Sequence, residues 1–213
     1  MKVAPRELPD TMELLEPDSY RGGKAFYDFT PRIIYKKSKC HEDSPEMQYY
    51  EGKLNHIWVD LFILDKLPAS RAGAEFTRFL HKAVYGMAMG HRYKLDFGKY
   101  SLIHKIFVGG LAAAGRLVPM KLIFAMQKAA ALKDRHSKGS LRYYSNYQPD
   151  YLYVTVDKSC CDQVEDWDFE DTRLMIPNGW HQILTEVYGN YMEMPPEDKR
   201  VPTHSSQQIR IFD

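Results

Sequence analysis

The run HIWVDLFIL, residues 56–64, is the most informative stretch of the sequence. Its residues are mostly branched or aromatic and Pro68 follows it, which is the pattern of a buried strand. One acid, Asp60, stands in the middle of this run. A carboxylate with apolar neighbours on both sides is costly to bury unless it is paired, hydrogen-bonded or bound to a metal. Asp60 is therefore a candidate functional residue, although an aspartate turned to solvent or held by backbone amides fits the same pattern.

A helical segment is predicted on the C-terminal side of this strand, over about residues 69–134. Apolar residues recur there at helical spacing in three stripes, and Pro119 suits the first turn of the third helix. We expect these stripes to be the packed faces of the helices. Their members are Ala72, Phe76, Phe79, Leu80 and Ala83; Leu102, Ile103, Ile106, Phe107, Gly110, Leu111 and Ala114; and Leu122, Ile123, Met126, Ala129 and Ala130.

More strands and one further helix are predicted toward the C-terminus. Residues 151–156 and 167–176 have the composition of strands, and the segment between them is an acidic loop with two cysteines. The next helix is expected to begin after Asn178 and to end at Gly189, with Tyr188 in its buried stripe. Residues 1–30 show little periodicity and are expected to be extended or looped. The fold class is thus predicted as α+β, with several helices packed against a small mixed sheet.

Composition sets the broad class of the protein. The 213 residues are 44% hydrophobic, which suffices for one domain spanning residues 1–213. Lysine and arginine number 29 against 28 acids, so no broad basic field is available to bind nucleic acid. The apolar stretch 106–126 is broken by glycines, a proline and charges, which argues against a membrane span but leaves peripheral membrane contact open.

The cysteines and the N-terminal residues bear on the location of the chain. Cys40, Cys160 and Cys161 are odd in number and two of them are adjacent, an awkward geometry for an intrachain disulfide. Residues 1–9 contain charges and prolines where the apolar core of a signal peptide would run. Both observations favour a cytoplasmic protein with reduced thiols.

Two charged segments have the side chains to meet phosphates or a metal. The segment PRIIYKKSKC, residues 31–40, carries basic side chains that can donate charged hydrogen bonds to phosphate, although a solvated strand edge fits equally. Asp166 and Asp168 have the acid-x-acid spacing with which metal-dependent glycosyltransferases hold a sugar nucleotide. Their acidic neighbours also fit a solvated turn. The basic residues of the first segment are Arg32, Lys36, Lys37 and Lys39.

Two motifs resemble those of the LicD family. The run IWVDLFILDKLP, residues 57–68, has the family's hydrophobic strand bearing an acid, followed by a second acid, Asp65, and a proline. The run YGNYMEMPPEDKR, residues 188–200, resembles the closing signature of the family, and His204 follows it. A helical segment and the strand sequence FEDTRLMIP, residues 169–177, lie between the two motifs, so the resemblance covers most of the chain.

The resemblance implies a nucleotidyltransferase-like fold and a phosphotransferase activity. LicD-family enzymes move phosphocholine, ribitol phosphate or a similar group from a CDP-linked donor to a cell-surface glycan of the lipopolysaccharide or teichoic acid type. In the family a carboxylate pair and a third carboxylate hold a divalent metal, magnesium or manganese, which would bridge the donor phosphates. Asp60 matches the third carboxylate and is the expected catalytic residue and metal ligand. The expected substrate-binding residues are Arg32, Lys37, Tyr191 and Arg200.

The sequence departs from the family at its N-terminus. The carboxylate pair belongs to a motif of a glycine turn, an arginine and several aspartates, and this motif is missing here. The segment KVAPRELPD, residues 2–10, resembles the family segment immediately C-terminal to that motif, so we expect the chain to begin inside the family domain and not to sustain transfer alone. The alternative is a non-catalytic remnant or accessory protein of the same fold. A weaker alternative is a glycosyltransferase that uses Asp166 and Asp168.

The resemblance also predicts where the two motifs lie in space. Asp60 is expected on a central strand, with its carboxylate in a cleft. The closing segment, residues 188–200, is expected to fold back toward the same cleft, because a proline-stiffened loop usually serves a site and not a core.

Overall fold

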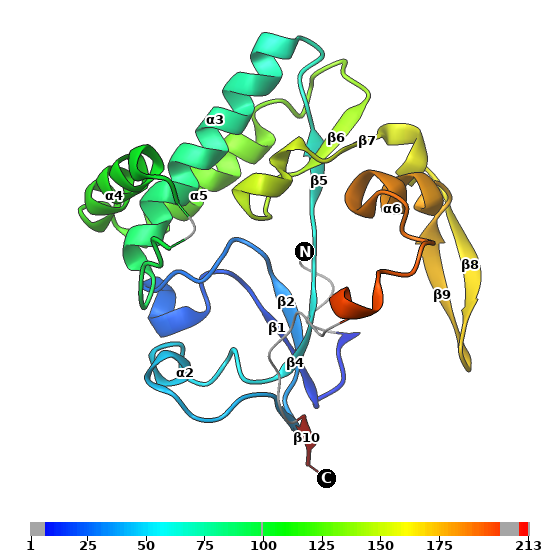
Figure 1. Cartoon of the computed structure of the whole chain (residues 1–213), viewed down its shortest axis with the longest axis horizontal. Coiled ribbons are helices and arrows are strands. Elements are labelled where there is room, and N and C mark those ends of the chain that lie inside the picture. Colours follow the sequence, from blue (N-terminus) through cyan, green and yellow to red (C-terminus); the bar gives the residue numbers. More distant parts are fainter. Residues whose placement is uncertain (1–6, 99, 201–208, 213) are drawn as a thin grey trace.

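The computed structural model of the chain describes residues 7–98, 100–200 and 209–212 (Figure 1). These residues form helices and small antiparallel sheets, which confirms the predicted α+β class. The prediction of a single mixed sheet is wrong, because the described strands form several separate sheets whose pairs are all antiparallel. The short elements outside the sheets and the main helices are η1 (Tyr20–Gly23), α2 (Pro45–Tyr49), η2 (Met89–His91), η3 (Pro149–Tyr153), η4 (Lys158–Cys161) and η5 (Glu197–Lys199).

The first sheet has three antiparallel strands in the order β1-β2-β4. They are β1 (Met12–Leu15), β2 (Arg32–Tyr35) and β4 (Ile57–Asp60). The register places Arg32 of β2 directly opposite Asp60 of β4. The expectation of a central strand for Asp60 is wrong, because β4 lies at an edge of this sheet and β2 lies in the middle.

The predicted strand over residues 56–64 is divided between two sheets. β4 ends at Asp60, and β5 (Leu64–Lys66) belongs to a second antiparallel sheet with β6 (Leu141–Tyr144) and β7 (Thr155–Asp157), in the order β5-β6-β7. Val59 and Phe62 are exposed, so the run is not a buried strand as expected. The chain crosses from one sheet to the other at residues 61–63, directly after Asp60.

The predicted helical segment is confirmed. It contains α3 (Arg71–Ala88), α4 (Leu102–Arg116) and α5 (Met120–Leu132), and the hydroxyls of Ser70 and Ser101 cap the first two helices. Each hydroxyl accepts a hydrogen bond from the backbone N–H three residues on, which satisfies a free donor of the first turn. Of the helices described, none is both long and apolar enough to cross a membrane.

The packed faces of α3 and α4 differ from the predicted stripes. On α3, Phe76 and Phe79 are more than half exposed, and the buried face is formed by Ala74, Thr77, His81, Val84, Tyr85 and Ala88. The large apolar residues of the first two turns of α4 are also exposed. The reason is the close crossing of the two helices: a Cβ at Gly115 would lie 1.9 Å from the carbonyl oxygen of Met87. Gly115 of α4 therefore lies at the crossing, and Leu111 packs against another glycine, Gly86 of α3, while the large residues of the first two turns face outward.

The main core lies where α3, α4 and α5 meet an irregular segment before β2. Phe26 and Phe29 of this segment are buried against Tyr85, Met120 and Ile123. The two phenylalanine rings have centroids 4.7 Å apart, and Phe26 meets the Tyr85 ring edge-on at 5.4 Å. Residues 1–30 were expected to be only extended or looped, but the described part contains β1 and supplies part of the core.

The C-terminal part consists of a hairpin and a helix. β8 (Val164–Phe169) and β9 (Thr172–Pro177) pair antiparallel, so the predicted strand over 167–176 is two strands joined by a turn, and residues 164–166 are strand instead of loop. α6 (Trp180–Tyr188) follows, with Gly179 instead of Asn178 as its N-cap. Gly189 ends α6 with φ of 70°, as expected for a glycine stop. β3 (Ser38–Lys39) pairs with β10 (Arg210–Ile211).

Candidate functional site

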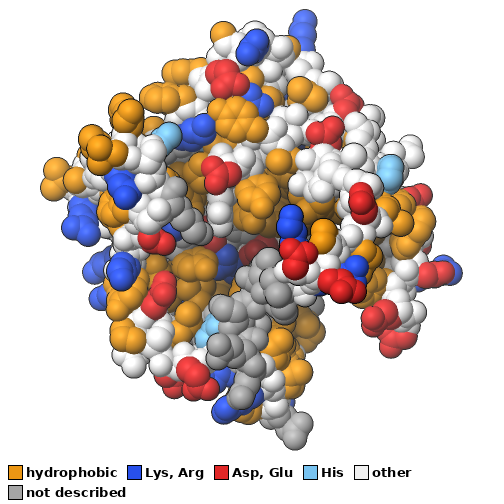
Figure 2. All heavy atoms as spheres, viewed as in Figure 1, with side chains coloured by type: hydrophobic (Ala, Val, Ile, Leu, Met, Phe, Trp, Pro, Cys, Tyr) orange, Lys and Arg blue, Asp and Glu red, His pale blue; other side chains and the backbone are white. Residues whose placement is uncertain are grey.

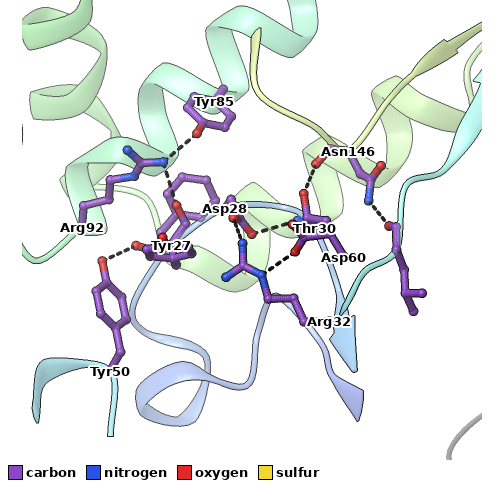
Figure 3. A network of polar contacts seen from close by, with 11 residues as sticks. Tyr27, Asp28, Thr30, Arg32, Tyr50, Asp60, Tyr85, Arg92 and Asn146 are labelled. Atoms are coloured by element: carbon purple, nitrogen blue, oxygen red, sulfur yellow. Dashed lines mark hydrogen bonds and ion pairs between the residues drawn. The ribbon is translucent and has the colours of Figure 1, made fainter. Parts of the chain in front are cut away.

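Asp28, Arg32 and Asp60 form a charged triad where β2 and β4 lie side by side (Figure 3). Arg32 donates from Nη2 to Oδ2 of Asp28 at 2.5 Å and from Nε to Oδ1 of Asp60 at 2.7 Å. The position of Asp60 follows from the cross-strand register, and that of Asp28 from the bend that leads into β2. One guanidinium thus bridges two carboxylates that are 32 residues apart in the sequence.

The triad is buried unevenly, and its charges do not cancel. The side chains of Arg32 and Asp28 are 8% and 10% exposed, whereas that of Asp60 is 27% exposed. Burial raises the pKa of Asp28 above its ordinary value, against the opposing attraction of Arg32. Burial alone would lower the pKa of Arg32, but Asp28 and Asp60 raise it. With both carboxylates ionised the triad has a net negative charge, and Asp60 is its member most open to a ligand.

Aromatic rings and backbone groups hold the arginine and Asp28 in place. The Arg32 guanidinium carbon lies 4.7 Å from the ring centroid of Tyr27 and 5.7 Å from that of Trp58. The second oxygen of Asp28 accepts a hydrogen bond from the backbone N–H of Thr30 at 3.0 Å. These contacts leave the arginine little freedom to turn away from the carboxylates.

Asn146 fastens the segment that follows Asp60. Its side chain donates to the carbonyl oxygen of Leu61 at 2.9 Å and accepts from the N–H of Ile63 at 2.8 Å. The backbone carbonyl of Asn146 also accepts a hydrogen bond from the Thr30 hydroxyl at 3.0 Å. Through these hydrogen bonds Asn146 connects three segments: the bend before β2, the crossing after Asp60 and the residues that follow β6.

A second arginine supports the same bend from the side of the helices. Arg92 donates from Nη2 to the carbonyl oxygen of Tyr27 at 2.7 Å and to the hydroxyl of Tyr85 at 2.6 Å (Figure 3). The hydroxyl of Tyr50 donates to the carbonyl oxygen of Phe26 at 2.9 Å. The backbone that carries Asp28 is therefore fixed on both sides.

An aromatic cluster lies beside the triad. Phe62 packs against Tyr147 and Tyr144, with ring centroids 4.4 and 5.6 Å away, and Tyr147 contacts Tyr151 at 4.3 Å. Burial, the neighbouring Tyr151 and the negative charge of Asp60 together raise the pKa of Tyr147 to about 12. Figure 2 shows a hollow near the middle of the view, with hydrophobic side chains at its floor. Partly exposed rings next to a carboxylate are suited to an organic cation.

Comparison with curated proteins finds a similarity to the lipopolysaccharide cholinephosphotransferase LicD of Haemophilus influenzae, at 26% identity over 188 residues. This similarity supports the resemblance of the chain to the LicD family. The similarity covers 83% of this chain and 66% of LicD, so the chain spans just under two thirds of the length of that relative. No family model and no solved structure matches the chain.

The closing motif of the LicD resemblance begins at Tyr188, the last residue of α6. Tyr188 itself is 70% exposed, so the prediction that it belongs to the core is wrong.

The other predicted substrate-binding residues make their hydrogen bonds away from Asp60 or are exposed. Tyr191 places its hydroxyl 2.7 Å from Nδ1 of His181, and Arg200 donates from Nε to the carbonyl oxygen of Pro195 at 2.7 Å. Lys37 is exposed and follows the end of β2 opposite to Arg32. His204 lies outside the described residues. Of the predicted site residues, the structure therefore unites Arg32 and Asp60.

The triad does not by itself form the ligand set that the LicD family implies for a divalent metal. A metal held by oxygen ligands needs several converging carboxylates, but here a guanidinium stands between Asp28 and Asp60. Within the part of the chain that the structure describes, no group of three or more histidine, cysteine, aspartate or glutamate side chains is placed to hold a metal ion. The metal-ligand role of Asp60 stays a prediction.

Asp166 and Asp168 lie on the exposed strand β8 instead of a turn. Asp168 accepts a hydrogen bond from Nε of Arg173 on β9 at 2.9 Å, and both side chains of this pair are largely exposed. An ion pair of this kind is an ordinary feature of a solvated hairpin. The geometry does not favour a sugar-nucleotide site at this position.

Two residues of the site were not found from the sequence. Asp28 stands in the run FYDFTPR with aromatic neighbours on both sides, so the argument that singled out Asp60 applies to it as well. Its spacing from Arg32 was a further available signal. Asn146 offered no comparable signal, because its partners in residues 61–63 come from a distant part of the sequence.

Proposed function

We propose that this protein transfers a phosphorylated alcohol, phosphocholine in the first instance, from a CDP-linked donor to a cell-surface glycan. The similarity to LicD supports this proposal, since it runs over 83% of the chain and the name of that relative states a phosphocholine transfer to lipopolysaccharide. A glycan of the lipopolysaccharide or teichoic acid type is the proposed acceptor. The free thiols of Cys40, Cys160 and Cys161 fit a cytoplasmic location for the reaction.

In the proposed reaction a glycan hydroxyl attacks the phosphorus that bears the alcohol. The bond from that phosphorus to the oxygen bridging it to CMP breaks, CMP leaves, and the glycan retains the phosphorylated alcohol. Asp60 is the proposed acceptor of the hydroxyl proton, because it is the most exposed carboxylate of the triad and Arg32 fixes only its Oδ1. Arg32 and Asp28 are positioning residues for Asp60.

The aromatic cluster is the proposed site for the choline group. A quaternary ammonium cannot donate hydrogen bonds, so it is recognised by the faces of aromatic rings and by nearby negative charge. Phe62, Tyr147 and Tyr151 supply the rings, and Asp60 supplies the charge. A ribitol group has neither property and would not gain from this cluster.

Binding of CDP-choline to the 213-residue chain tests the donor assignment. Isothermal titration is expected to detect binding, and Tyr147→Leu should weaken it by roughly fivefold, because a cation–π contact contributes on the order of 1 kcal/mol. The matched control is CDP-ribitol, whose affinity should not respond to the substitution. Equal losses for both donors would contradict the choline assignment.

Turnover is measured as CMP release in the presence of magnesium or manganese and lipopolysaccharide, with protein expressed from the natural gene. Asp60→Asn should lower the rate by at least about 100-fold, which is the usual contribution of a general base. Asp166→Asn should leave the rate of CMP release unchanged. A lower rate in that variant, together with activity of the protein on sugar nucleotides, would support the glycosyltransferase alternative. Retained turnover in Asp60→Asn would remove Asp60 from the site.

Two further outcomes bear on the carboxylate pair and on the non-catalytic alternative. Steady CMP release by the 213-residue chain would contradict the expectation that Asp60 needs a carboxylate pair. Donor binding without turnover in the product of the natural gene would favour the alternative of a non-catalytic accessory protein.

A further inference from the structure

The outward side of α4 is an apolar surface. Leu102, Ile103, Ile106 and Phe107 are 75%, 67%, 69% and 68% exposed, although all four are large and hydrophobic. They lie on one face of the helix, since residues three and four apart in a helix are neighbours. Figure 2 shows hydrophobic side chains projecting from the molecule at the left of the view, where Figure 1 places α4.

The apolar face continues along the whole helix. Gly110, Ala113 and Ala114 follow at the same spacing and are exposed, and Leu117 at the end of the helix is 87% exposed. The opposite side of α4 is also apolar and packs on α3 through Leu111 and Gly115. A surface helix normally has a polar outer face, so a helix with two apolar faces indicates that the outer one has a partner.

The charged side chains of α4 and α5, apart from histidine, are all basic. Residues 97–133 contain six of the 29 lysines and arginines and none of the 28 acids, while the whole chain has a net charge of +1. Lys105, Arg116, Lys121 and Lys128 of this segment are exposed on α4 and α5. An excess of basic side chains thus lies in the part of the chain that also has the exposed apolar face.

We propose that α4 binds an anionic lipid surface, with Leu102, Ile103, Ile106 and Phe107 entering the boundary between headgroups and acyl chains. An apolar helix face combined with lysines and arginines is the composition of helices that lie in a membrane interface. The basic side chains account for the choice of lipid over a second copy of this chain, because two such faces would bring like charges together. The proposal concerns the position of the protein and does not depend on the donor or acceptor.

Sedimentation with vesicles tests this proposal without any measurement of transfer. The chain should bind vesicles of phosphatidylglycerol mixed with phosphatidylcholine more tightly than vesicles of phosphatidylcholine alone. Ile106→Ser combined with Phe107→Ser should weaken binding by roughly 100-fold, because two large apolar side chains no longer leave water. Lys105→Gln combined with Lys121→Gln should weaken it by roughly tenfold on the anionic vesicles alone.

The matched control removes two exposed apolar side chains from another element. Leu174→Ser combined with Met175→Ser on β9 should leave vesicle binding unchanged, and circular dichroism should show native helix content in all variants. Binding that survives the Ile106 and Phe107 substitutions, or that is equal on both kinds of vesicle, would overturn the proposal. Dimerisation in solution that the same substitutions abolish, with no vesicle binding, would assign the face to a second copy of the chain and also overturn it.

Discussion

Substitution of Asp28 by asparagine tests whether the charged triad stabilises the fold. The two carboxylate oxygens of Asp28 accept hydrogen bonds from Nη2 of Arg32 at 2.5 Å and from the N–H of Thr30 at 3.0 Å. An asparagine of the same shape has only one accepting oxygen. Its NH₂ group must therefore face either Nη2 of Arg32 or the N–H of Thr30. That donor then has no acceptor at this position, although it is buried.

The size of the effect follows from the burial of the pair. Loss of one partner of a buried ion pair costs about 3–5 kcal/mol. We expect a value near the lower end, about 3 kcal/mol, because Asp60 still pairs with Arg32 after the substitution and because burial already opposes ionisation of Asp28. The matched control is Asp168→Asn, whose ion pair with Arg173 is largely exposed and should contribute less than about 1 kcal/mol.

The measurement is the free energy of unfolding in urea at neutral pH, followed by tryptophan fluorescence and by circular dichroism. Coincidence of the two transitions would justify a two-state treatment. If Asp28→Asn costs no more than Asp168→Asn, the triad is not a stabilising feature of the fold, and the argument from burial is refuted.

Two further predictions concern the helices. Burial lowers the pKa of His81 below its ordinary 6.5, so the folded state binds a proton at this imidazole less readily than the unfolded state does. The free energy of unfolding should therefore fall as the pH drops below 6.5. His81→Gln should reduce this pH dependence, as measured by urea titrations at several pH values. Gly115→Ala should lower the free energy of unfolding by roughly 2–3 kcal/mol, because the new Cβ would meet the Met87 carbonyl. Gly110→Ala, with open space around it, should raise that free energy by about 0.5–1 kcal/mol. Thermal unfolding measures both variants, and equal effects would contradict the close crossing of α3 and α4.

The sequence by itself determined the features that depend on local patterns. Helical spacing between residues 69 and 134 places α3, α4 and α5 correctly, because the periodicity of apolar residues acts within a few residues. The isolated carboxylate of Asp60 was recognised for the same reason. Its apolar neighbours in the sequence made it costly to bury without a partner.

Only the tertiary structure decided what each of these elements contacts. The partner of Asp60 is Arg32, which the antiparallel register of β2 and β4 brings opposite to it, and Asp28 joins through the same guanidinium. The run 56–64 is divided between two sheets because Asn146, far along the chain, bonds the backbone of residues 61–63. Such contacts depend on the path of the whole chain, which local propensity does not encode.

The same distinction applies to the faces of the helices. Periodicity identified the apolar stripes of α3 and α4, but it did not tell an inner stripe from an outer one, since both helices have apolar residues on more than one side. The close approach of the two backbones at Gly115 and Met87 decided the orientation, because only residues without bulky side chains fit at that crossing. The large side chains of α4 were thereby turned outward, to the surface that we propose binds lipid.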